Sequence, residues 1–544
     1  MFAKQSAKGV WFGVSLVAAL AVGCGGAGDV SEDDDRLGPD GDKADTSALA
    51  TVLDFEWDGE LVTDWVSDPK AVVQDQLLFT IGQLNGNKSV GRLDRLQLTD
   101  TQTSDVAGGK KKLRYHAKMP VAWGSKTNLP RTYEFILPLD VSYQGQEAFT
   151  EKYKHDCVDW GAHDVDSGSM WYYYRPSNSG CRLAEGDVVR RTVAVSVSAS
   201  NTTGKYPEYN KVWEDNALKV VAIFGKYEDG ATTAGDAGIA AYNEFVRYIR
   251  SELAKFGAVT TIPAQVPEAP GVGTPDITFR VSLPAGKSVE VVALLVDNVR
   301  TAGPAFDARY EQLSTRADII AYNGHAGLGQ NVRALARKGK WVAGQYVIVF
   351  MNGCDTFAYV DGSLAETRRA INPDDASGSK YLDWVVNAMP AYFASDAEAS
   401  MALIRGLLSF DAPKTYEQIM ADIDSSQVVL VTGEQDNTFS PSAPPPSSWT
   451  GIDETVTVAR AAEKRWQTPM LEAGRYSFAI TGSGDADLYV RKANAPSTTK
   501  YDCRPYKNGS NESCIVTLAA PTTVHVMVRG YKPTSTVRLV GKKR

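Results

Sequence analysis

Residues 318–325 read DIIAYNGH, and residues 346–354 read YVIVFMNGC. Each stretch is an apolar run that ends in a small polar turn and delivers one reactive side chain, His325 in the first and Cys354 in the second. Near-continuous apolar runs of this kind indicate strands that helices cover on both faces. Because the carboxyl ends of adjacent parallel strands meet at one edge of a sheet, we expect the two side chains to lie together there.

The surrounding region alternates strands with helices. LKVVAIFG and SVEVVALLVD are further apolar runs, while AGIAAYNEFVRYIRSELAKFG has the pattern of a helix that stops at Gly. Shorter helical stretches follow at about 304–316 and 329–338. The pattern predicts an α/β domain over residues 206–435 with a mostly parallel sheet.

Two other regions flank this domain, as expected for a chain of 544 residues. Residues 51–205 contain short segments of alternating polar and apolar residues, such as DFEWDGELVT and TYEFILPLDVS, and they predict an antiparallel all-β domain with a disulfide loop. A Pro- and Ser-rich linker at 436–451 leads to a small β-sandwich at 452–544.

The first residues have the order of a secretory signal. Lys4 and Lys8 precede an apolar stretch that ends at Cys24. The run LAVGC resembles the lipobox of bacterial lipoproteins, and this resemblance implies a signal peptide at 1–24, lipidation of Cys24 and membrane attachment through the lipid. We therefore expect a cell-envelope protein, either an outer-membrane lipoprotein or a cell-surface protein. Residues 25–50 are acidic and poor in apolar residues, which predicts a disordered tether.

Charge and cysteine usage fit an exported protein. The net charge of −8, without a concentrated Lys/Arg stripe, argues against a nucleic-acid partner. Cys157 and Cys181 flank one loop and Cys503 and Cys514 flank another, so two local disulfides are expected. Cys354 is then left without a partner, which indicates either a reactive thiol or an inert buried one.

A cysteine becomes a nucleophile when a neighbouring imidazole takes its proton. At DIIAYNGHAG and VIVFMNGC the chain resembles the caspase-like (clan CD) cysteine peptidases, in which one hydrophobic strand precedes His-Gly and a second ends in Ala-Cys or Ser-Cys. The resemblance implies that Cys354 is the nucleophile and His325 the general base. It also implies an oxyanion hole made by the backbone amides of Ala326 and Cys354.

The chain departs from the pattern of that family at two positions. Ala326 stands where the family usually has Gly, so a positive φ there would be strained. Gly353 stands where Ala or Ser is usual. Asn352 occupies a position that lines the specificity pocket in the family, and we expect a basic residue at P1 of the substrate.

The C-terminal segment resembles the bacterial pre-peptidase C-terminal domain at GDADLYVR, YDCRPYKNGSNESC and HVMVRGY. The resemblance implies a small β-sandwich that is appended to secreted peptidases and is often cleaved off on maturation. Asp485 and Asp487 could bind calcium there. We otherwise expect no cofactor and no metal.

The loop at 155–181 carries potential metal ligands at His155, Asp156, His163, Asp164 and Asp166, but their spacing fits no metal motif. A disulfide-stapled surface loop with an aromatic base, MWYYYRP, is the preferred interpretation.

Three functional hypotheses follow. The first is an exported, lipid-anchored cysteine endopeptidase that uses the His325/Cys354 dyad on protein or peptide substrates. The alternative is a non-catalytic surface adhesion or binding lipoprotein with a caspase-like fold. The third is a metal-dependent hydrolase centred on the 155–166 loop, which would be sensitive to chelators.

Overall fold

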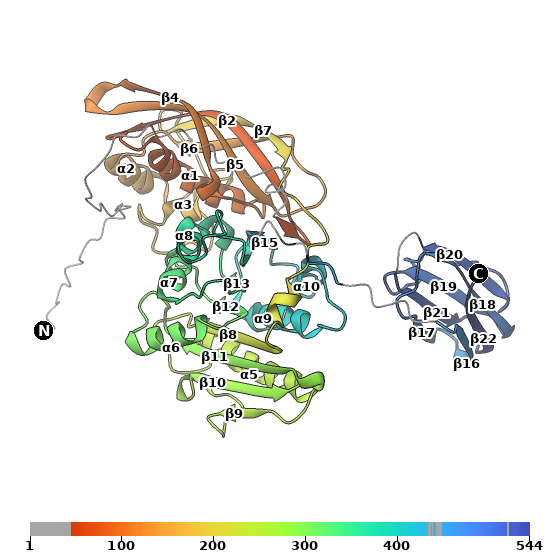
Figure 1. Ribbon diagram of the computed structural model, residues 1–544. Helices are drawn as coiled ribbons and strands as arrows, with labels where there is room; N and C mark the ends of the chain where they lie inside the picture. Colours follow the sequence, from red (N-terminus) through yellow and green to blue (C-terminus); the bar gives the residue numbers. More distant parts are fainter. Residues whose placement is uncertain (1–44, 434–436, 438, 442–448, 519–521) are drawn as a thin grey trace, which may run out of the picture.

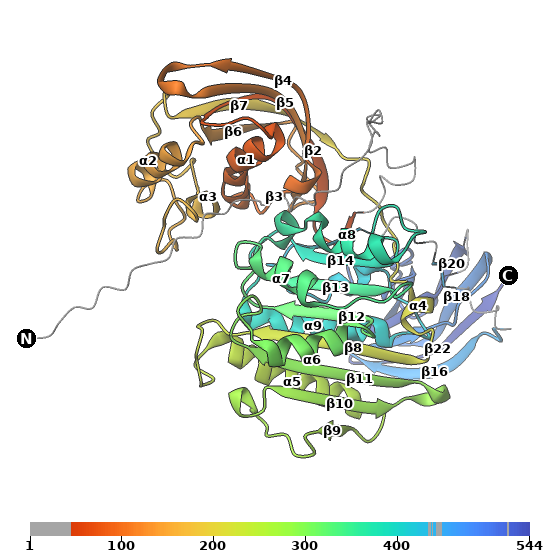
Figure 2. The same ribbon diagram turned by 60° about the vertical axis from the view of Figure 1, so that its left-hand side comes forward.

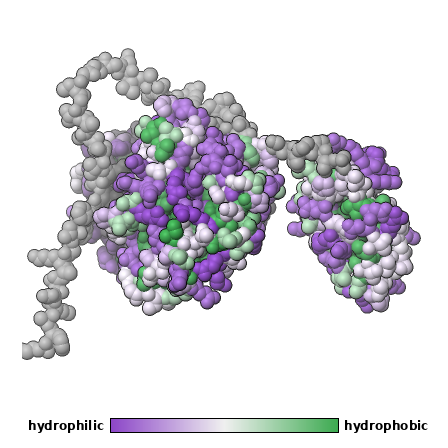
Figure 3. Space-filling view, turned by 60° about the horizontal axis from the view of Figure 1, so that its bottom comes forward, coloured by the Kyte–Doolittle hydropathy of each residue, from purple (hydrophilic) through white to green (hydrophobic). Residues whose placement is uncertain are grey.

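The computed structural model describes residues 45–433, 437, 439–441, 449–518 and 522–544 (Figure 1). The predicted signal peptide at 1–24, the lipidation site Cys24 and most of the predicted tether and linker lie outside these residues. No helix within the described ranges is both long enough and apolar enough to cross a membrane. On the face seen in Figure 3, hydrophobic residues form small patches among hydrophilic ones.

The N-terminal domain is an antiparallel sheet packed on helices, so the prediction of an all-β fold for this region is wrong. The sheet has the order β3-β5-β2-β7-β6, with β4 paired to β5. Its strands are β2 (Thr51–Thr63), β3 (Val90–Gly91), β4 (Gln97–Asp105), β5 (Lys111–Trp123), β6 (Thr132–Pro138) and β7 (Val188–Val197), and its helices are α1 (Pro69–Asn85), α2 (Tyr143–Tyr153) and α3 (Met170–Tyr173).

Helix α1 explains the error. Its buried residues lie around most of its circumference, so the sequence lacks the 3.6-residue apolar period that marks a surface helix. The start of the helix is well specified, since the Asp68 side chain accepts a hydrogen bond from the backbone N–H of Ala71 at 3.0 Å and Pro69 occupies the first turn. The alternation expected for β2 is present, with Phe55 and Trp57 buried and Glu56 exposed between them.

The central domain is built on a nine-stranded sheet with the order β1-β15-β14-β13-β12-β8-β11-β10-β9. Figure 2 shows the strands from β14 to β9 stacked in this order, with the N-terminal domain beyond β14. The strands are β1 (Thr46–Ser47), β8 (Ala217–Gly225), β9 (Thr260–Ile262), β10 (Asp276–Ser282), β11 (Ser288–Val296), β12 (Ile319–Asn323), β13 (Val347–Asn352), β14 (Leu382–Asn387) and β15 (Val429–Gly433).

Helices cover both faces of this sheet. They are α4 (Tyr209–Val212), α5 (Ala237–Ala254), α6 (Pro304–Ser314), α7 (Gln330–Lys338), α8 (Gly362–Ile371), α9 (Phe393–Leu408) and α10 (Tyr416–Met420). Alternate residues of β8 enter two different cores. Val220 and Phe224 pack in the core that contains α5 and α9, while Val221 and Ile223 pack in the core that contains α6 and α7. The second core continues into the N-terminal domain, so these two domains share buried side chains.

The central sheet is mixed rather than mostly parallel from edge to edge. Strands β11, β8, β12, β13 and β14 are parallel, whereas β1, β15, β10 and β9 pair antiparallel with their neighbours. Strand β1 comes from the end of the predicted tether, and the Ser47 hydroxyl donates to the Val429 carbonyl at 2.6 Å. The predicted tether ends at residue 50. The prediction of disorder is therefore wrong for Thr46 and Ser47, because they form strand β1 and pair with β15 at the edge of the sheet. The finer assignment of a caspase-like fold stays a prediction.

The C-terminal domain is a β-sandwich with a separate core. One antiparallel sheet has the order β16-β22-β18-β20 and the other has the order β17-β21-β19. The strands are β16 (Ile452–Ala459), β17 (Glu463–Gln467), β18 (Gly474–Ser483), β19 (Ala486–Lys492), β20 (Glu512–Leu518), β21 (Val524–Gly530) and β22 (Thr534–Lys543). A disulfide joins Cys503 to Cys514, and in the N-terminal domain another joins Cys157 to Cys181.

Candidate functional site

His325 and Cys354 follow neighbouring parallel strands at the carboxyl edge of the central sheet. The register pairs Asn323 at the end of β12 with Asn352 at the end of β13. Beyond this pair, the backbone N–H of Gly324 donates to the Asn352 carbonyl at 3.1 Å. The turn after β13 requires Gly353, because a Cβ atom there would lie only 2.8 Å from the Gly324 carbonyl oxygen.

The imidazole of His325 is exposed and clamped between two aromatic rings. Its Nε2 atom lies 3.1 Å from the backbone carbonyl oxygen of Tyr227. The rings of Tyr227 and Phe393 each lie 5.1 Å from the imidazole, centroid to centroid. The backbone carbonyl of His325 accepts hydrogen bonds from the Tyr322 hydroxyl and from Asn331 Nδ2, both at 2.7 Å. These contacts fix the loop and direct one ring nitrogen to the Tyr227 backbone.

The thiol of Cys354 is poorly suited to act as a nucleophile. Cys354 as a residue is partly accessible, yet its sulfur lies among side chains of both domains, and its hydrogen-bond contact is with the Ala391 carbonyl at 3.8 Å. Burial, together with the nearby carboxyl group of Asp355, raises the pKa of the thiol to about 12. At neutral pH this cysteine is therefore protonated. Only the thiolate form of a cysteine is reactive, so Cys354 is a poor nucleophile.

Asn352 does not line a substrate pocket, so that prediction is wrong. Its side chain is completely buried. Its Nδ2 atom donates to Asn323 Oδ1 at 2.9 Å and to Asp396 Oδ1 at 3.0 Å. Its Oδ1 atom accepts from Asn387 Nδ2 at 3.0 Å and from Gln427 Nε2 at 2.9 Å. Four bonds satisfy the amide completely, so Asn352 ties together four elements beneath the edge of the sheet.

The network around Asn352 also holds a buried acid. Asp396, near the start of α9, is 1% exposed, and burial raises its pKa well above the usual range. Burial therefore favours the neutral form of this carboxyl group, which avoids the cost of a buried charge. Ser400, one turn later on α9, donates to Asn323 Oδ1 at 2.9 Å and closes the network.

The N-terminal domain covers this edge of the sheet with residues that sequence reasoning missed. Asn85 Nδ2 donates to Asp355 Oδ1 at 2.7 Å, and Asn85 Oδ1 accepts from Arg175 Nη2 at 2.9 Å. Tyr172 lies next to Cys354, and its side chain lowers the pKa of the thiol against the effect of burial. The segment MWYYYRP, which contains Tyr172 and Arg175, was expected to form the base of a surface loop. Its high aromatic content was the signal in the sequence that could have indicated these contacts with the central domain.

The backbone amides expected to form an oxyanion hole belong to Ala326 and Cys354. The strain expected at Ala326 is not found, because the positive φ angles of this turn fall at Gly324 (142°), Gly327 (58°), Leu328 (51°) and Gly329 (85°). Glycine therefore occupies three of the four positions in the turn where its conformational freedom is needed.

Metal ligands do not converge in the described part of the chain. No group of three or more His, Cys, Asp or Glu side chains could hold a metal ion among the residues that the structure describes. In the C-terminal domain, Asp487 pairs with Arg504 at 2.7 Å, and Asp485 Oδ1 accepts from the Gly509 N–H at 2.9 Å. The suggestion of calcium at these two aspartates stays a prediction, although both carboxylates already have protein partners.

Comparison with known proteins identifies the C-terminal unit. Residues 471–530 match the family described as the bacterial pre-peptidase C-terminal domain. The predicted pre-peptidase C-terminal domain is confirmed.

The curated relatives share a short segment with this chain. A protein named Neutral protease from Vibrio proteolyticus is 60% identical over 50 residues, which is 9% of this chain and 8% of that protein. Virulence metalloprotease from Vibrio anguillarum is 53% identical over 58 residues, or 11% and 10% of the two chains. Alkaline serine exoprotease A from Vibrio alginolyticus is 47% identical over 58 residues, or 11% of each chain.

A solved structure described as "Solution structure of vEP C-ter 100" is 39% identical and covers 17% of this chain and 90% of that chain, with a TM-score of 0.15. The matched segment thus amounts to about a tenth of the length of the three curated relatives.

These comparisons contradict the prediction of a cysteine endopeptidase. Two of the relatives are named as a metalloprotease and a serine protease, so the domain that they share with this chain accompanies other catalytic types. The site geometry agrees, because the Cys354 thiol is protonated and the His325 imidazole bonds to the Tyr227 backbone. The dyad assignment and the oxyanion hole predicted at Ala326 and Cys354 are withdrawn with it.

Proposed function

We propose that this protein is exported and acts in the breakdown of protein substrates, and that its pre-peptidase C-terminal domain holds the substrate. The observation that supports this proposal is the similarity of residues 471–530 to a domain found in proteins that are named proteases. The secretory signal expected at 1–24 and the two disulfides fit an oxidising location outside the cytoplasm. No catalytic group is assigned, because the similarity is limited to the C-terminal segment.

The C-terminal domain carries an aromatic surface suited to a polypeptide. The guanidinium group of Arg504 lies over the rings of Tyr489, at 4.8 Å, and Tyr506, at 4.0 Å. Asp487 orients the guanidinium through hydrogen bonds of 2.7 and 3.1 Å. Tyr506 is 73% exposed, and the exposed Tyr531 shares a hydrogen bond of 2.7 Å with the Tyr489 hydroxyl. Exposed tyrosine rings offer apolar faces together with polar edges, which suits contact with extended peptide chains.

The test uses full-length protein and fluorescein-labelled casein, and it measures binding and release of labelled fragments separately. Tyr506→Ala should weaken casein binding by about fivefold, since the loss of an exposed aromatic contact is worth roughly 1 kcal/mol. Tyr143→Ala, which removes an exposed tyrosine from the N-terminal domain, should leave binding unchanged.

Inhibitors then separate the catalytic types: 1,10-phenanthroline should stop fragment release by a metal-dependent activity, and a sulfonyl fluoride should stop a serine-dependent one. Binding without fragment release would remove the hydrolytic part of the proposal. Absence of both binding and release would refute it entirely.

A further inference from the structure

The C-terminal domain differs in charge from the rest of the chain. Residues 452–544 contain 15 Lys and Arg against 8 Asp and Glu, whereas the whole chain contains 57 and 65. The domain therefore carries an excess of positive charge, although the net charge of the protein is −8. Such an asymmetry indicates that the partner of this domain is negatively charged.

Arginine side chains gather on the outer face of the sheet β17-β21-β19. The inward-facing valines of β21 pack in the core of the sandwich, so the alternate residues His525, Met527 and Arg529 lie on the outer face. The strand register adds Arg465 of β17 and Arg491 of β19 to this face, because they pair with Met527 and His525 respectively. Three adjacent strands therefore each contribute one guanidinium group to the same face.

Arg504 adds a fourth guanidinium group to this face. It lies over the ring of Tyr489, an outward-facing residue of β19, at 4.8 Å from the ring centroid. The Cys503–Cys514 disulfide ties its segment to β20, and the Cys503 N–H donates to a carbonyl of β19 at 3.0 Å. The position of this arginine is therefore fixed. We call the set Arg465, Arg491, Arg504 and Arg529 the arginine face.

One carboxylate of the arginine face serves two guanidinium groups. Glu463 Oε2 accepts from Arg465 Nη2 at 2.7 Å, and Glu463 Oε1 accepts from Arg529 Nη1 at 2.8 Å. The Nε atom of Arg529 has no hydrogen-bond partner. A single negative charge thus faces two positive charges, and one guanidinium donor stays available.

Arg491 forms no ion pair with any residue that the structure describes. Its Nη1 atom donates to the Ala495 carbonyl at 3.3 Å. Asp487 binds Arg504 at 2.7 Å, and Asp502 Oδ2 accepts from a backbone N–H of β19 at 2.8 Å. The nearby carboxylates therefore already have partners, and the arginine face keeps an excess of positive charge.

We propose that the arginine face selects protein substrates with acidic segments, and that its guanidinium groups bind their Asp and Glu side chains. This inference rests on the proposed function, in which the C-terminal domain holds the substrate. Guanidinium groups present pairs of N–H donors that match the two oxygens of a carboxylate. Glu463 and Asp487 lie among the arginines and divide the positive charge. Divided charge suits the spaced carboxylates of a polypeptide better than the continuous negative charge of a membrane or a nucleic acid.

The test measures the fluorescence anisotropy of two labelled twelve-residue peptides, one alternating Gly with Glu and one alternating Gly with Lys, on titration with the full-length protein. The Glu peptide should bind at least about tenfold more tightly than the Lys peptide, and salt should weaken its binding. The double variant Arg465→Gln/Arg491→Gln should weaken binding of the Glu peptide by about fivefold and reduce its dependence on salt concentration. Lys at the same two positions keeps the charges and should restore most of the binding.

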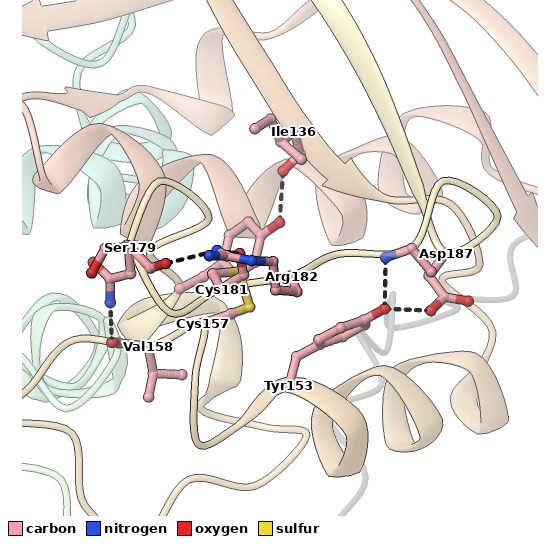
Figure 4. Close-up of a disulfide and its surroundings, with 11 residues drawn as sticks. Ile136, Tyr153, Cys157, Val158, Ser179, Cys181, Arg182 and Asp187 are labelled. Atoms are coloured by element: carbon pink, nitrogen blue, oxygen red, sulfur yellow. Dashed lines mark hydrogen bonds between the residues drawn. A yellow bond between two sulfur atoms is a disulfide. The ribbon is translucent and has the colours of Figure 1, made fainter.

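Arg182→Gln is the matched control. Arg182 is an exposed residue of the N-terminal domain, next to the Cys157–Cys181 disulfide. Its Nη1 atom donates to the carbonyls of Ser179 at 2.7 Å and Cys181 at 2.9 Å, so its guanidinium group bonds to the backbone as that of Arg491 does (Figure 4). Its replacement should leave binding of the Glu peptide unchanged.

Equal binding of the two peptides, or unchanged binding of the Glu peptide by the double variant, would overturn the proposal. If the double variant alters the circular dichroism spectrum, Arg491→Gln alone decides in its place, because that guanidinium group bonds only to a backbone carbonyl. Vesicles of phosphatidylcholine and phosphatidylglycerol serve as a third probe. Vesicle binding that depends on the two arginines, without binding of the Glu peptide, would assign the face to a membrane and overturn the proposal.

Labelled casein separates this inference from the proposed function. Casein binding that Tyr506→Ala weakens and the double arginine variant does not would leave the proposed function standing and reject the selection of acidic segments. Binding of the Glu peptide without binding or cleavage of casein would support the charge selection and refute the proposed function.

Discussion

The substitution Asp355→Asn tests how the N-terminal domain covers the edge of the central sheet. Asp355 is completely buried, and its Oδ1 atom accepts the hydrogen bond from Asn85, whereas its Oδ2 atom has no hydrogen-bond partner. Burial raises the pKa of the carboxyl group to about 7, although the charge of Arg175 and the neighbouring side chains of Asn85 and Tyr172 oppose this shift. Asn keeps the acceptor for Asn85 and tolerates the left-handed backbone at this position, where φ is 53°.

The sign of the effect follows from proton linkage. A carboxyl group whose pKa rises on folding binds its proton more tightly in the folded state, so the fold is favoured at low pH. Stability is lost as the pH rises from the unfolded value near 4 to the folded value of about 7. With about 1.4 kcal/mol per pKa unit, the ionisable side chain should cost the protein roughly 3 kcal/mol more at pH 7.5 than at pH 4.5. The neutral variant lacks this cost.

The assay is urea unfolding of the full-length parent and variant at four pH values between 4.5 and 7.5. Because the N-terminal and central domains share a core, the transition that includes both of them is the one to follow. The free energy of unfolding of the variant, minus that of the parent, should increase by roughly 3 kcal/mol from pH 4.5 to pH 7.5. Asp100→Asn is the matched control, since Asp100 also has a left-handed backbone (φ 52°) but is exposed. A difference between variant and parent that stays constant with pH would refute the assignment of Asp355 as a protonated buried acid.

Two further predictions concern the same edge. Asn352→Ala should lower the free energy of unfolding by about 3 kcal/mol or more, because it leaves the buried hydrogen-bond partners of Asn352 unsatisfied. Substitution of an exposed residue, Asn494→Ala, should change the free energy of unfolding by less than about 0.5 kcal/mol. Equal melting temperatures for the two variants would contradict the role of the network. Iodoacetamide should label Cys354 at pH 7.5 at least about 100-fold more slowly than it labels a free cysteine, as measured by mass spectrometry. Tyr172→Ala should speed the labelling, because it removes a side chain that shields the thiol. Rapid labelling of the parent protein would show that the reactivity of the thiol is not reduced.

Much of the central fold could be predicted from the sequence because the signals are local. The apolar runs at β8, β11, β12 and β13 mark strands covered on both faces, and the structure places them together in the parallel part of the sheet. The strand-end turns put His325 and Cys354 at one edge, as expected from their positions in the chain. The pre-peptidase C-terminal domain was likewise recognisable from its residues.

The chemistry at that edge could not be predicted, because it depends on contacts between residues far apart in the chain. Tyr172 and Asn85 reach Cys354 and Asp355 from another domain, and no local pattern records the desolvation that they cause. The same holds for Asn352. From the sequence it was predicted to line a specificity pocket, but its amide is enclosed by partners from β12, β14, α9 and the segment before β15. The sequence by itself determined which residues end the two strands. Only the tertiary structure decided their protonation and exposure, because both depend on which distant side chains exclude water from them.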